Sequence, residues 1–111
     1  MPGIPLYQAK ADLFRALGHP VRVRVLELLL EGPRPVHELL ADIEVEPSNL
    51  SQQLGVLRRS GLVSSQREGM TVTYTLSSPE VAEMMTAARA VLTNVISGQQ
   101  SLLAELKAET A

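Results

Sequence analysis

The segment most informative about the fold is Pro47-Ser48-Asn49-Leu50-Ser51-Gln52-Gln53-Leu54-Gly55-Val56-Leu57-Arg58-Arg59-Ser60. At about 100° per residue, three of its leucines fall on one narrow stripe: Leu50, Leu54 and Leu57. The pattern predicts a helix over 47–60 whose leucine stripe faces a core, and Pro47 suits the first helical position. The opposite face holds only small, hydroxyl, amide and guanidinium groups: Ser48, Ser51, Gln52, Gly55 and Arg59, with Asn49 and Arg58 on its flanks.

The polar face of this helix suits the major groove of duplex DNA. There, arginine pairs with guanine, asparagine or glutamine pairs with adenine, and serine bonds to bases or phosphates. A merely solvated face is the alternative, but such faces are rich in glutamate and lysine, and this one has neither. Glycine costs about 1 kcal/mol relative to alanine in a helix interior. Gly55 therefore indicates a close approach, either by DNA or by a neighbouring helix.

The rest of the chain predicts four more helices and one β-hairpin. Apolar residues at helical spacing mark the helices, and Gly18, Pro20 and Pro33 separate them. The hairpin shows the two-residue alternation of a strand with one buried face. The expected helices cover 6–17, 20 to about 31, 36–41, 47–60 and 79–107, and the expected strands cover 62–67 and 71–76. This order is that of a winged helix-turn-helix, a mainly α fold with a β-hairpin wing.

Arg67 lies beside Gly69 near the tip of the expected hairpin, where it could reach a phosphate or the minor groove, although a lone arginine in a turn can equally be solvated. The residues expected to bind DNA are therefore Ser48, Asn49, Ser51, Gln52, Gln53, Arg58, Arg59 and Arg67. The rival interpretation is a winged-helix module that docks a partner protein on the same polar face. A steep fall of DNA affinity with salt distinguishes the two.

The composition fits one small domain that spans residues 1–111. The 111 residues are 45% hydrophobic, which is enough for a single modest core. The absence of cysteine excludes disulfides, thiolate metal sites and thiol switches. No charged segment followed by an apolar run opens the sequence, and no apolar stretch is long enough to cross a bilayer. The sequence therefore predicts a cytoplasmic protein without a membrane segment.

The formal net charge of −2 is a weak objection to DNA binding, because the charges are unevenly distributed. Eight of the ten Lys and Arg residues lie in the first 67 positions. Between Pro47 and Arg67 there are three arginines and no acid. Nothing catalytic stands out: no Ser/His/Asp set, Gly-rich phosphate loop or convincing carboxylate pair can be assembled. We therefore expect a binding protein and not an enzyme.

Three blocks of the sequence resemble the ArsR/SmtB family of small bacterial winged-helix repressors. Residues 14–26 resemble the family's entry into its second helix, and residues 48–63 resemble its recognition signature S-x-x-S-x-H-L-x-x-L-x-x-a-G-L-V. Arg67-Glu68-Gly69 and Tyr74-Thr75-Leu76 resemble its wing. The resemblance covers nearly the whole chain. It implies a transcriptional repressor that binds double-stranded DNA as a homodimer whose first and last helices form the interface.

The last helix supports a dimer independently, because its apolar residues recur near heptad spacing over a longer stretch than one small domain needs. A helix laid only on its own core is the alternative. The expected interface comprises Leu6, Leu13, Val81, Met84, Met85, Ala88, Val91, Leu92, Val95 and Leu102. A two-fold dimer sets its reading helices about one DNA turn apart, roughly 34 Å, which predicts an inverted-repeat operator.

The chain departs from the family at the metal sites. Many members sense metals through a Cys-Val-Cys-Asp-Leu type motif, but the matching stretch here is Pro35-Val36-His37-Glu38-Leu39. Another family site uses histidine on the last helix, which here has none. Zinc needs three or four ligands, and the other histidine, His19, sits where capping or solvation suits it better. We therefore expect no metal and no cofactor.

Met84 and Met85 leave room for an unidentified small-molecule effector. A small apolar molecule could lie between the dimer helices beside these methionines. Methionines at this spacing also serve as flexible filler in a hydrophobic core. The sequence leaves both interpretations open.

Overall fold

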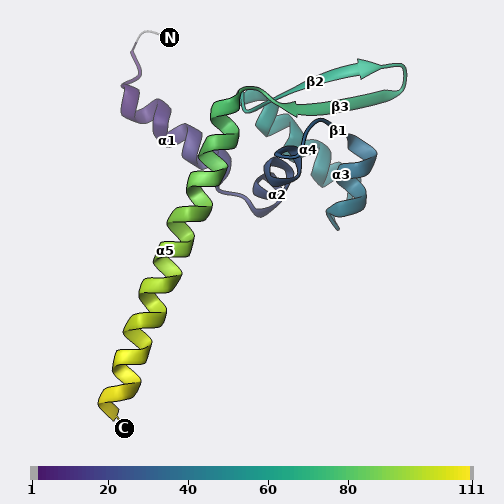
Figure 1. Cartoon of the computed structure of the whole chain (residues 1–111). Helices are drawn as coiled ribbons and strands as arrows, with labels where there is room; N and C mark the ends of the chain where they lie inside the picture. Colours follow the sequence, from purple (N-terminus) through teal and green to yellow (C-terminus); the bar gives the residue numbers. More distant parts are fainter. Residues whose placement is uncertain (1–2, 111) are drawn as a thin grey trace.

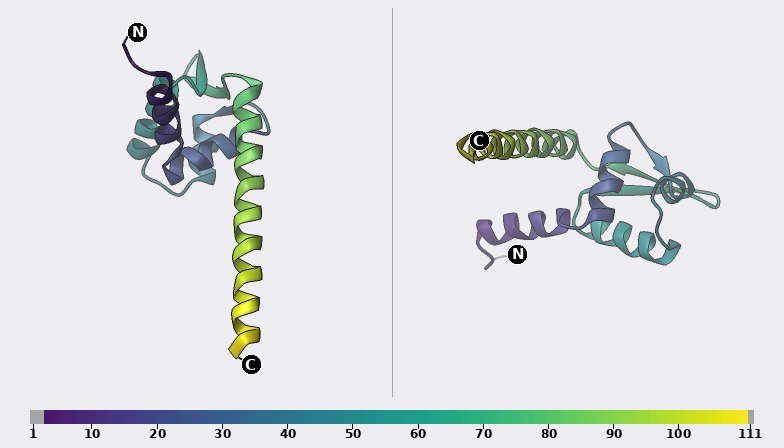
Figure 2. Two further views of the ribbon diagram at one scale, coloured as in Figure 1. Left: turned by 90° about the vertical axis from the view of Figure 1, so that its left-hand side faces the viewer. Right: turned by 90° about the horizontal axis from the view of Figure 1, so that it is seen from below.

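The computed structural model describes residues 3–110 of the chain and shows a winged helix-turn-helix, as predicted (Figure 1). The helices α2, α3 and α4 pack together beside a small sheet, while α1 and α5 leave this core on the same side (Figures 1 and 2). The elements are α1 (Leu6–Leu17), α2 (Pro20–Leu29), β1 (Arg34–Pro35), α3 (Val36–Asp42), α4 (Pro47–Arg59), β2 (Val63–Glu68), β3 (Thr71–Leu76) and α5 (Pro79–Thr110).

Local signals explain where α2 begins and where α4 ends. His19 caps α2, because its Nδ1 accepts a hydrogen bond of 3.1 Å from the backbone N–H of Val21. This confirms the capping role considered for His19. Beyond α4, Gly61 has φ +78°, and two backbone N–H groups close the helix end: Gly61 donates to Arg58 and Leu62 donates to Leu57, each at 3.0 Å. This double closure is a Schellman motif, which turns the chain sharply towards β2.

The sheet is larger than the predicted hairpin, because β1 pairs with β3 and gives the antiparallel order β1-β3-β2. Pro35 is tolerated in β1 because an edge strand does not need every N–H. The strands β2 and β3 pair from Val63 opposite Leu76 to Glu68 opposite Thr71. The two-residue turn between them starts with Gly69 at φ +62°, as a type II′ turn requires. The hairpin register is therefore fixed by a tight turn.

One hydrophobic core joins the helices to the sheet. Its fully buried side chains come from α2, α3 and α4: Val25, Leu26, Leu39, Leu50, Leu54 and Leu57. Tyr74 covers it from β3, and Val81 from the first turn of α5. Helix α2 ends at Leu29, two residues before the predicted Glu31. From Thr86 to Glu109 every residue of α5 is exposed, so most of this helix lies outside the core.

Candidate nucleic-acid interface

Helix α4 presents the polar face that its sequence predicts. The leucine stripe is buried, since Leu50, Leu54 and Leu57 are at most 2% exposed. The residues of the opposite face and its Arg58 flank are exposed: Ser48, Ser51, Gln52, Arg58 and Arg59. Asn49 is half-buried at one edge. The helix therefore offers hydroxyl, amide and guanidinium groups to a partner, with no carboxylate among them.

Gly55 makes room for Arg59. A Cβ placed on Gly55 would lie 3.0 Å from Nη1 of Arg59 and 3.7 Å from its Cζ. The group that approaches Gly55 is therefore an arginine one turn further along the same helix, and not a neighbouring helix. The guanidinium lies against the backbone of α4, on the exposed face.

Gln53 does not belong to this face, which corrects the prediction that it binds DNA. The residue is only 7% exposed. Its Oε1 accepts a hydrogen bond of 2.7 Å from Arg22 Nη1, and its Nε2 donates one of 3.1 Å to Asn49 Oδ1. Both ends of the amide are thus engaged inside the protein.

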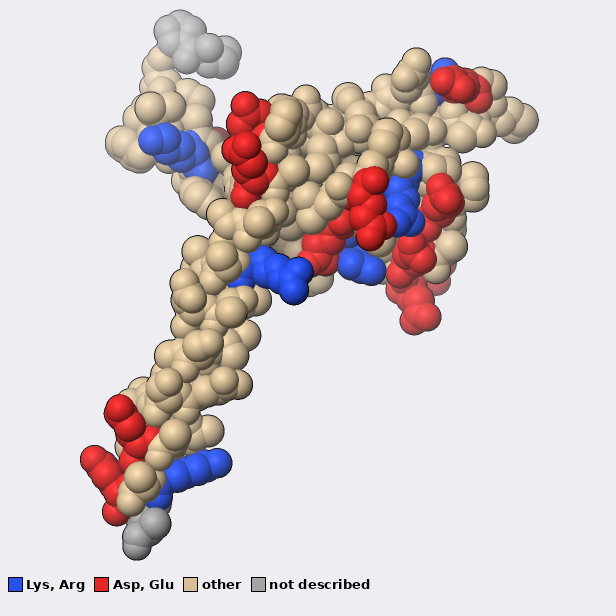
Figure 3. Space-filling model, in the orientation of Figure 1, with Lys and Arg blue, Asp and Glu red and all other residues tan. Residues whose placement is uncertain are grey.

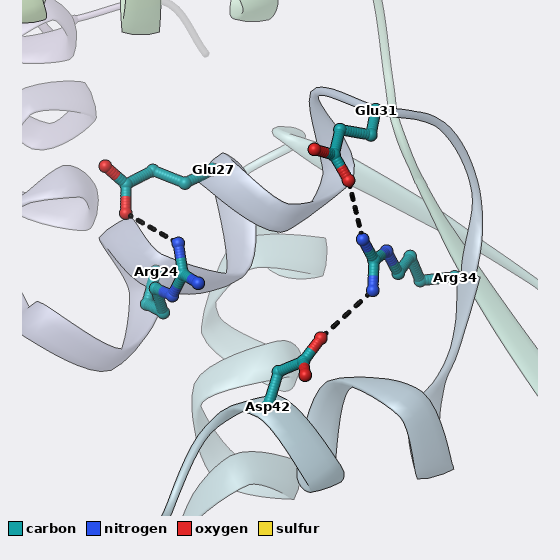
Figure 4. Close-up of polar contacts among 5 residues, drawn as sticks. All are labelled: Arg24, Glu27, Glu31, Arg34 and Asp42. Atoms are coloured by element: carbon teal, nitrogen blue, oxygen red, sulfur yellow. Dashed lines mark hydrogen bonds and ion pairs between the residues drawn. The ribbon is translucent and has the colours of Figure 1, made fainter.

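The arginines differ in whether an acid neutralises them. Figure 4 shows Arg24 paired with Glu27 at 3.5 Å, and Arg34 bridging Glu31 at 2.7 Å and Asp42 at 3.0 Å. Arg34 thereby ties β1 to α3 and to the loop that follows α2. Within residues 3–110 no ion pair of this kind involves the three arginines of the 47–67 window: Arg58, Arg59 and Arg67. These three cations remain available to an anionic partner.

The wing carries one basic and one acidic residue close together near its tip (Figure 3). Arg67 is exposed and lies opposite Val72 in the β2–β3 pairing, two positions before the turn at Gly69. The adjacent Glu68 pairs with Thr71. Neighbouring residues of a strand point to opposite faces, so Arg67 and Glu68 face opposite sides of the hairpin.

A second exposed surface is apolar and lies on α1 and α5. The residues between Arg89 and Glu105 include no charged side chain, and the middle of α5 accordingly shows neither red nor blue (Figure 3). Val91 is 61% exposed and Leu92 is 58% exposed. On α1, Leu6 and Phe14 are also exposed. A groove of about 430 Å³ runs between α1, α2 and α5 and is lined by Phe14, Leu17, Val23, Met84, Met85, Ala87, Ala88 and Val91.

The predicted interface residues divide into three groups by their exposure in the single chain. Val81 is buried in the core of its own chain, which corrects its assignment to a dimer interface. Leu13, Met84 and Met85 are half-buried and pack against that core, with part of each side chain accessible. The other predicted residues are exposed: Leu6, Ala88, Val91, Leu92, Val95 and Leu102.

Neither a metal cluster nor a membrane-spanning helix occurs among residues 3–110. In this described part of the chain, no three His, Cys, Asp or Glu residues come together in a way that could hold a metal ion. None of the described helices is both long and apolar enough to cross a membrane.

The fold and the exposed polar face of α4 are those of the winged helix-turn-helix class of proteins. The family model of the bacterial regulatory protein, arsR family, matches residues 19–65. An uncharacterised HTH-type transcriptional regulator of Mycobacterium tuberculosis, Rv0081, is 49% identical over 109 residues, which are 97% of this chain and 96% of the relative. The chain belongs to the ArsR family of bacterial regulatory proteins.

Solved structures and a second relative agree with this placement. The crystal structure of Rv0081 matches with a TM-score of 0.82 and 50% identity, over 87% of this chain and 98% of that one. The homodimeric winged helix-turn-helix DNA-binding domain of Mb0332 from Mycobacterium bovis, solved by NMR, matches with a TM-score of 0.77 and 25% identity, over 88% and 95%. The transcriptional activator HlyU of Vibrio cholerae is 44% identical over 73 residues, 66% of this chain and 68% of the relative.

Proposed function

We propose that this protein is a sequence-specific, DNA-binding transcriptional regulator whose α4 enters the major groove. The observation that carries the proposal is the exposed face of α4, which combines Ser51 and Gln52 with two arginines that form no ion pair with an acid among the described residues. Arginine and glutamine read base edges, and serine reaches bases or phosphates. Arg67 on the wing supplies a further phosphate or minor-groove contact. A bacterial protein with this role acts in the cytoplasm, and no catalytic role is proposed.

The proposed active form is a homodimer built by α1 and α5. Apolar side chains that are half exposed along a helix are covered in a stable assembly, and the heptad-like spacing on α5 suits a helical partner. The homodimeric state of the Mb0332 domain supports this arrangement. The apolar groove beside Met84 and Met85 is then covered by the second copy, so the proposal needs no effector molecule. A two-fold dimer of winged helices reads an inverted repeat.

A binding experiment with the intact protein tests the proposal. A duplex is first selected from a random-sequence pool by the wild-type protein, and the consensus is expected to be an inverted repeat. Affinity for that duplex should fall steeply as salt rises, because phosphate contacts release counterions. Arg59→Ala should weaken binding by about tenfold or more, in line with roughly 1–3 kcal/mol for a specific arginine contact.

Arg24→Ala serves as the matched control, because it removes the same charge from a residue that is paired with Glu27 and lies outside α4. It should leave affinity nearly unchanged. A flat salt response, together with equal affinity of the Arg59 and Arg24 variants, would favour the rival function, a winged-helix module that docks a protein on the α4 face. Whether operator binding represses or activates is read from a reporter gene placed behind the selected site. Repression is expected where that site overlaps the promoter.

A further inference from the structure

Arg22 joins the end of α1 to the inner face of α4. Its Nε donates a hydrogen bond of 2.7 Å to the carbonyl of Ala16, and its Nη2 donates one of 3.2 Å to the carbonyl of Arg15. Both carbonyls belong to the last turn of α1, where carbonyl groups lack partners within the helix and a cation is favoured. The remaining contact of Arg22 is the 2.7 Å bond from Nη1 to Oε1 of Gln53.

This arginine sets the direction of the hydrogen bonds that follow. A guanidinium only donates, so the end of the Gln53 amide that faces Arg22 must be its oxygen. The Nε2 of Gln53 then faces the other way and donates to Oδ1 of Asn49 at 3.1 Å. Because Oδ1 of Asn49 faces this donor, its Nδ2 is the end that turns away from Gln53. Each orientation follows from the donor-only character of the first residue.

We propose that Arg22 and Gln53 are positioning residues that present Asn49 to DNA as a hydrogen-bond donor. The groups that fit such a donor are acceptors: a phosphate oxygen, N7 of guanine or adenine, O6 of guanine, or O4 of thymine. The paired contact that asparagine makes with adenine needs Oδ1 as well, and one of the two lone pairs of that oxygen already accepts from Gln53, which makes the paired contact less favourable. The inference rests on the proposed DNA-binding function. It also connects the dimerisation helix α1 to the reading helix through a single side chain.

Gln53→Glu is the decisive substitution for this Arg22–Gln53–Asn49 relay. It keeps the hydrogen bond from Arg22 to residue 53 and reverses the one between residue 53 and Asn49. A glutamate at position 53 still accepts from Arg22, which preserves the link between α1 and α4. It cannot donate to Asn49, so the Asn49 amide should turn round, donate to the carboxylate and direct its Oδ1 outwards. If Gln53 only held α1 and α4 together, Gln53→Glu would leave the affinity for DNA unchanged.

The relay is measured by a double-mutant cycle with the duplex selected by the wild-type protein. Asn49→Ala and Gln53→Glu should each lower affinity by about three- to tenfold, the range for one hydrogen bond. In the Asn49→Ala background, Gln53→Glu should have almost no further effect, since the two residues act through one contact. A coupling between the two substitutions of less than about twofold overturns the proposal. Circular dichroism and sedimentation confirm that each variant remains folded and dimeric.

A second selection from the random pool, made with the Gln53→Glu protein, shows whether Asn49 donates to a base or to a phosphate. If Asn49 contacts a base, the preference at one position in each half-site should change from an acceptor, on guanine, on thymine or at N7 of adenine, to a donor, at N4 of cytosine or N6 of adenine. If Asn49 contacts a phosphate, the consensus should stay the same while the coupling persists. Arg22→Lys tests the first hydrogen bond of the relay. Lysine keeps the charge but lacks the planar fork of arginine, so this variant should bind DNA more weakly than the wild-type protein.

The controls distinguish failure of this inference from failure of the proposed function. If Arg59→Ala weakens binding and the salt response is steep, but the Asn49 and Gln53 substitutions act independently, only the relay is refuted. If none of these substitutions changes affinity and the salt response is flat, the DNA-binding function itself is refuted.

Discussion

Replacing Gly55 with alanine should make the protein more stable and weaken its binding to DNA. Glycine in a helix interior costs about 1 kcal/mol relative to alanine. The three atoms nearest to the added methyl group all belong to the guanidinium of Arg59, with Nη1 at 3.0 Å, and that group is the far end of a flexible side chain. A shift of the guanidinium by a few tenths of an ångström removes the contact at little cost, so most of the gain should remain. We expect the free energy of unfolding to rise by roughly 0.5–1 kcal/mol per chain.

The same shift displaces the guanidinium of Arg59, which the proposed function places against DNA, so affinity for the selected duplex should fall slightly while stability rises. Gly98→Ala is the matched control for stability, because Gly98 is also inside a helix and its added methyl group would meet no side chain of the single chain, over residues 3–110, within 4 Å. Because Gly98 lies in the part of α5 assigned to the dimer interface, Arg24→Ala remains the control for DNA affinity. Urea unfolding of the two glycine variants and DNA titration of the Gly55 and Arg24 variants provide the measurements. A Gly55→Ala protein that is less stable than wild type would contradict the expected gain in helix stability.

Three further substitutions test other parts of the structure. His19→Ala should cost about 1 kcal/mol by removing the cap of α2, and His19→Asn should restore most of it, both measured by urea unfolding. Gly61→Ala places a side chain at φ +78° and should cost at least about 1 kcal/mol, with a lower thermal midpoint and unchanged secondary structure by circular dichroism. Leu92→Lys should shift the dimer to monomer in sedimentation without exposing the core, because Leu92 is 58% exposed in the single chain. A Leu92→Lys protein that stays dimeric would contradict the proposed interface.

The sequence predicts the parts of the fold that depend on neighbouring residues. The leucine stripe of α4, the cap at His19 and the alternation in β3 are all local patterns, and each corresponds to an observed element. The strand β1 is different, because two residues carry no periodicity. Arg34 and Pro35 form a strand only because β3 lies beside them, which is a consequence of tertiary structure.

Two predicted roles are wrong because residue type is a poorer guide to burial than position in the helix. Gln53 lies three residues after Leu50, which places it only about 60° from the buried stripe. That angle is the sequence signal for its burial. No comparable signal identifies Arg22, whose partners at Ala16 and Gln53 come together only in the folded chain. Val81 begins the apolar seam of α5, but the first turn of that helix still lies on its own core.

The absence of charge along the middle of α5 agrees better with a second copy of this chain, related by two-fold symmetry, than with a different partner protein. At a two-fold interface, residues near the axis meet the same residues of the second copy. A lysine or glutamate there would face its own charge, and burying such a pair costs free energy that no opposite charge repays. A different partner protein could instead supply a complementary charge. The 15 residues between Arg89 and Glu105 are all uncharged and exposed in the single chain, which agrees with the proposed contact with an identical helix.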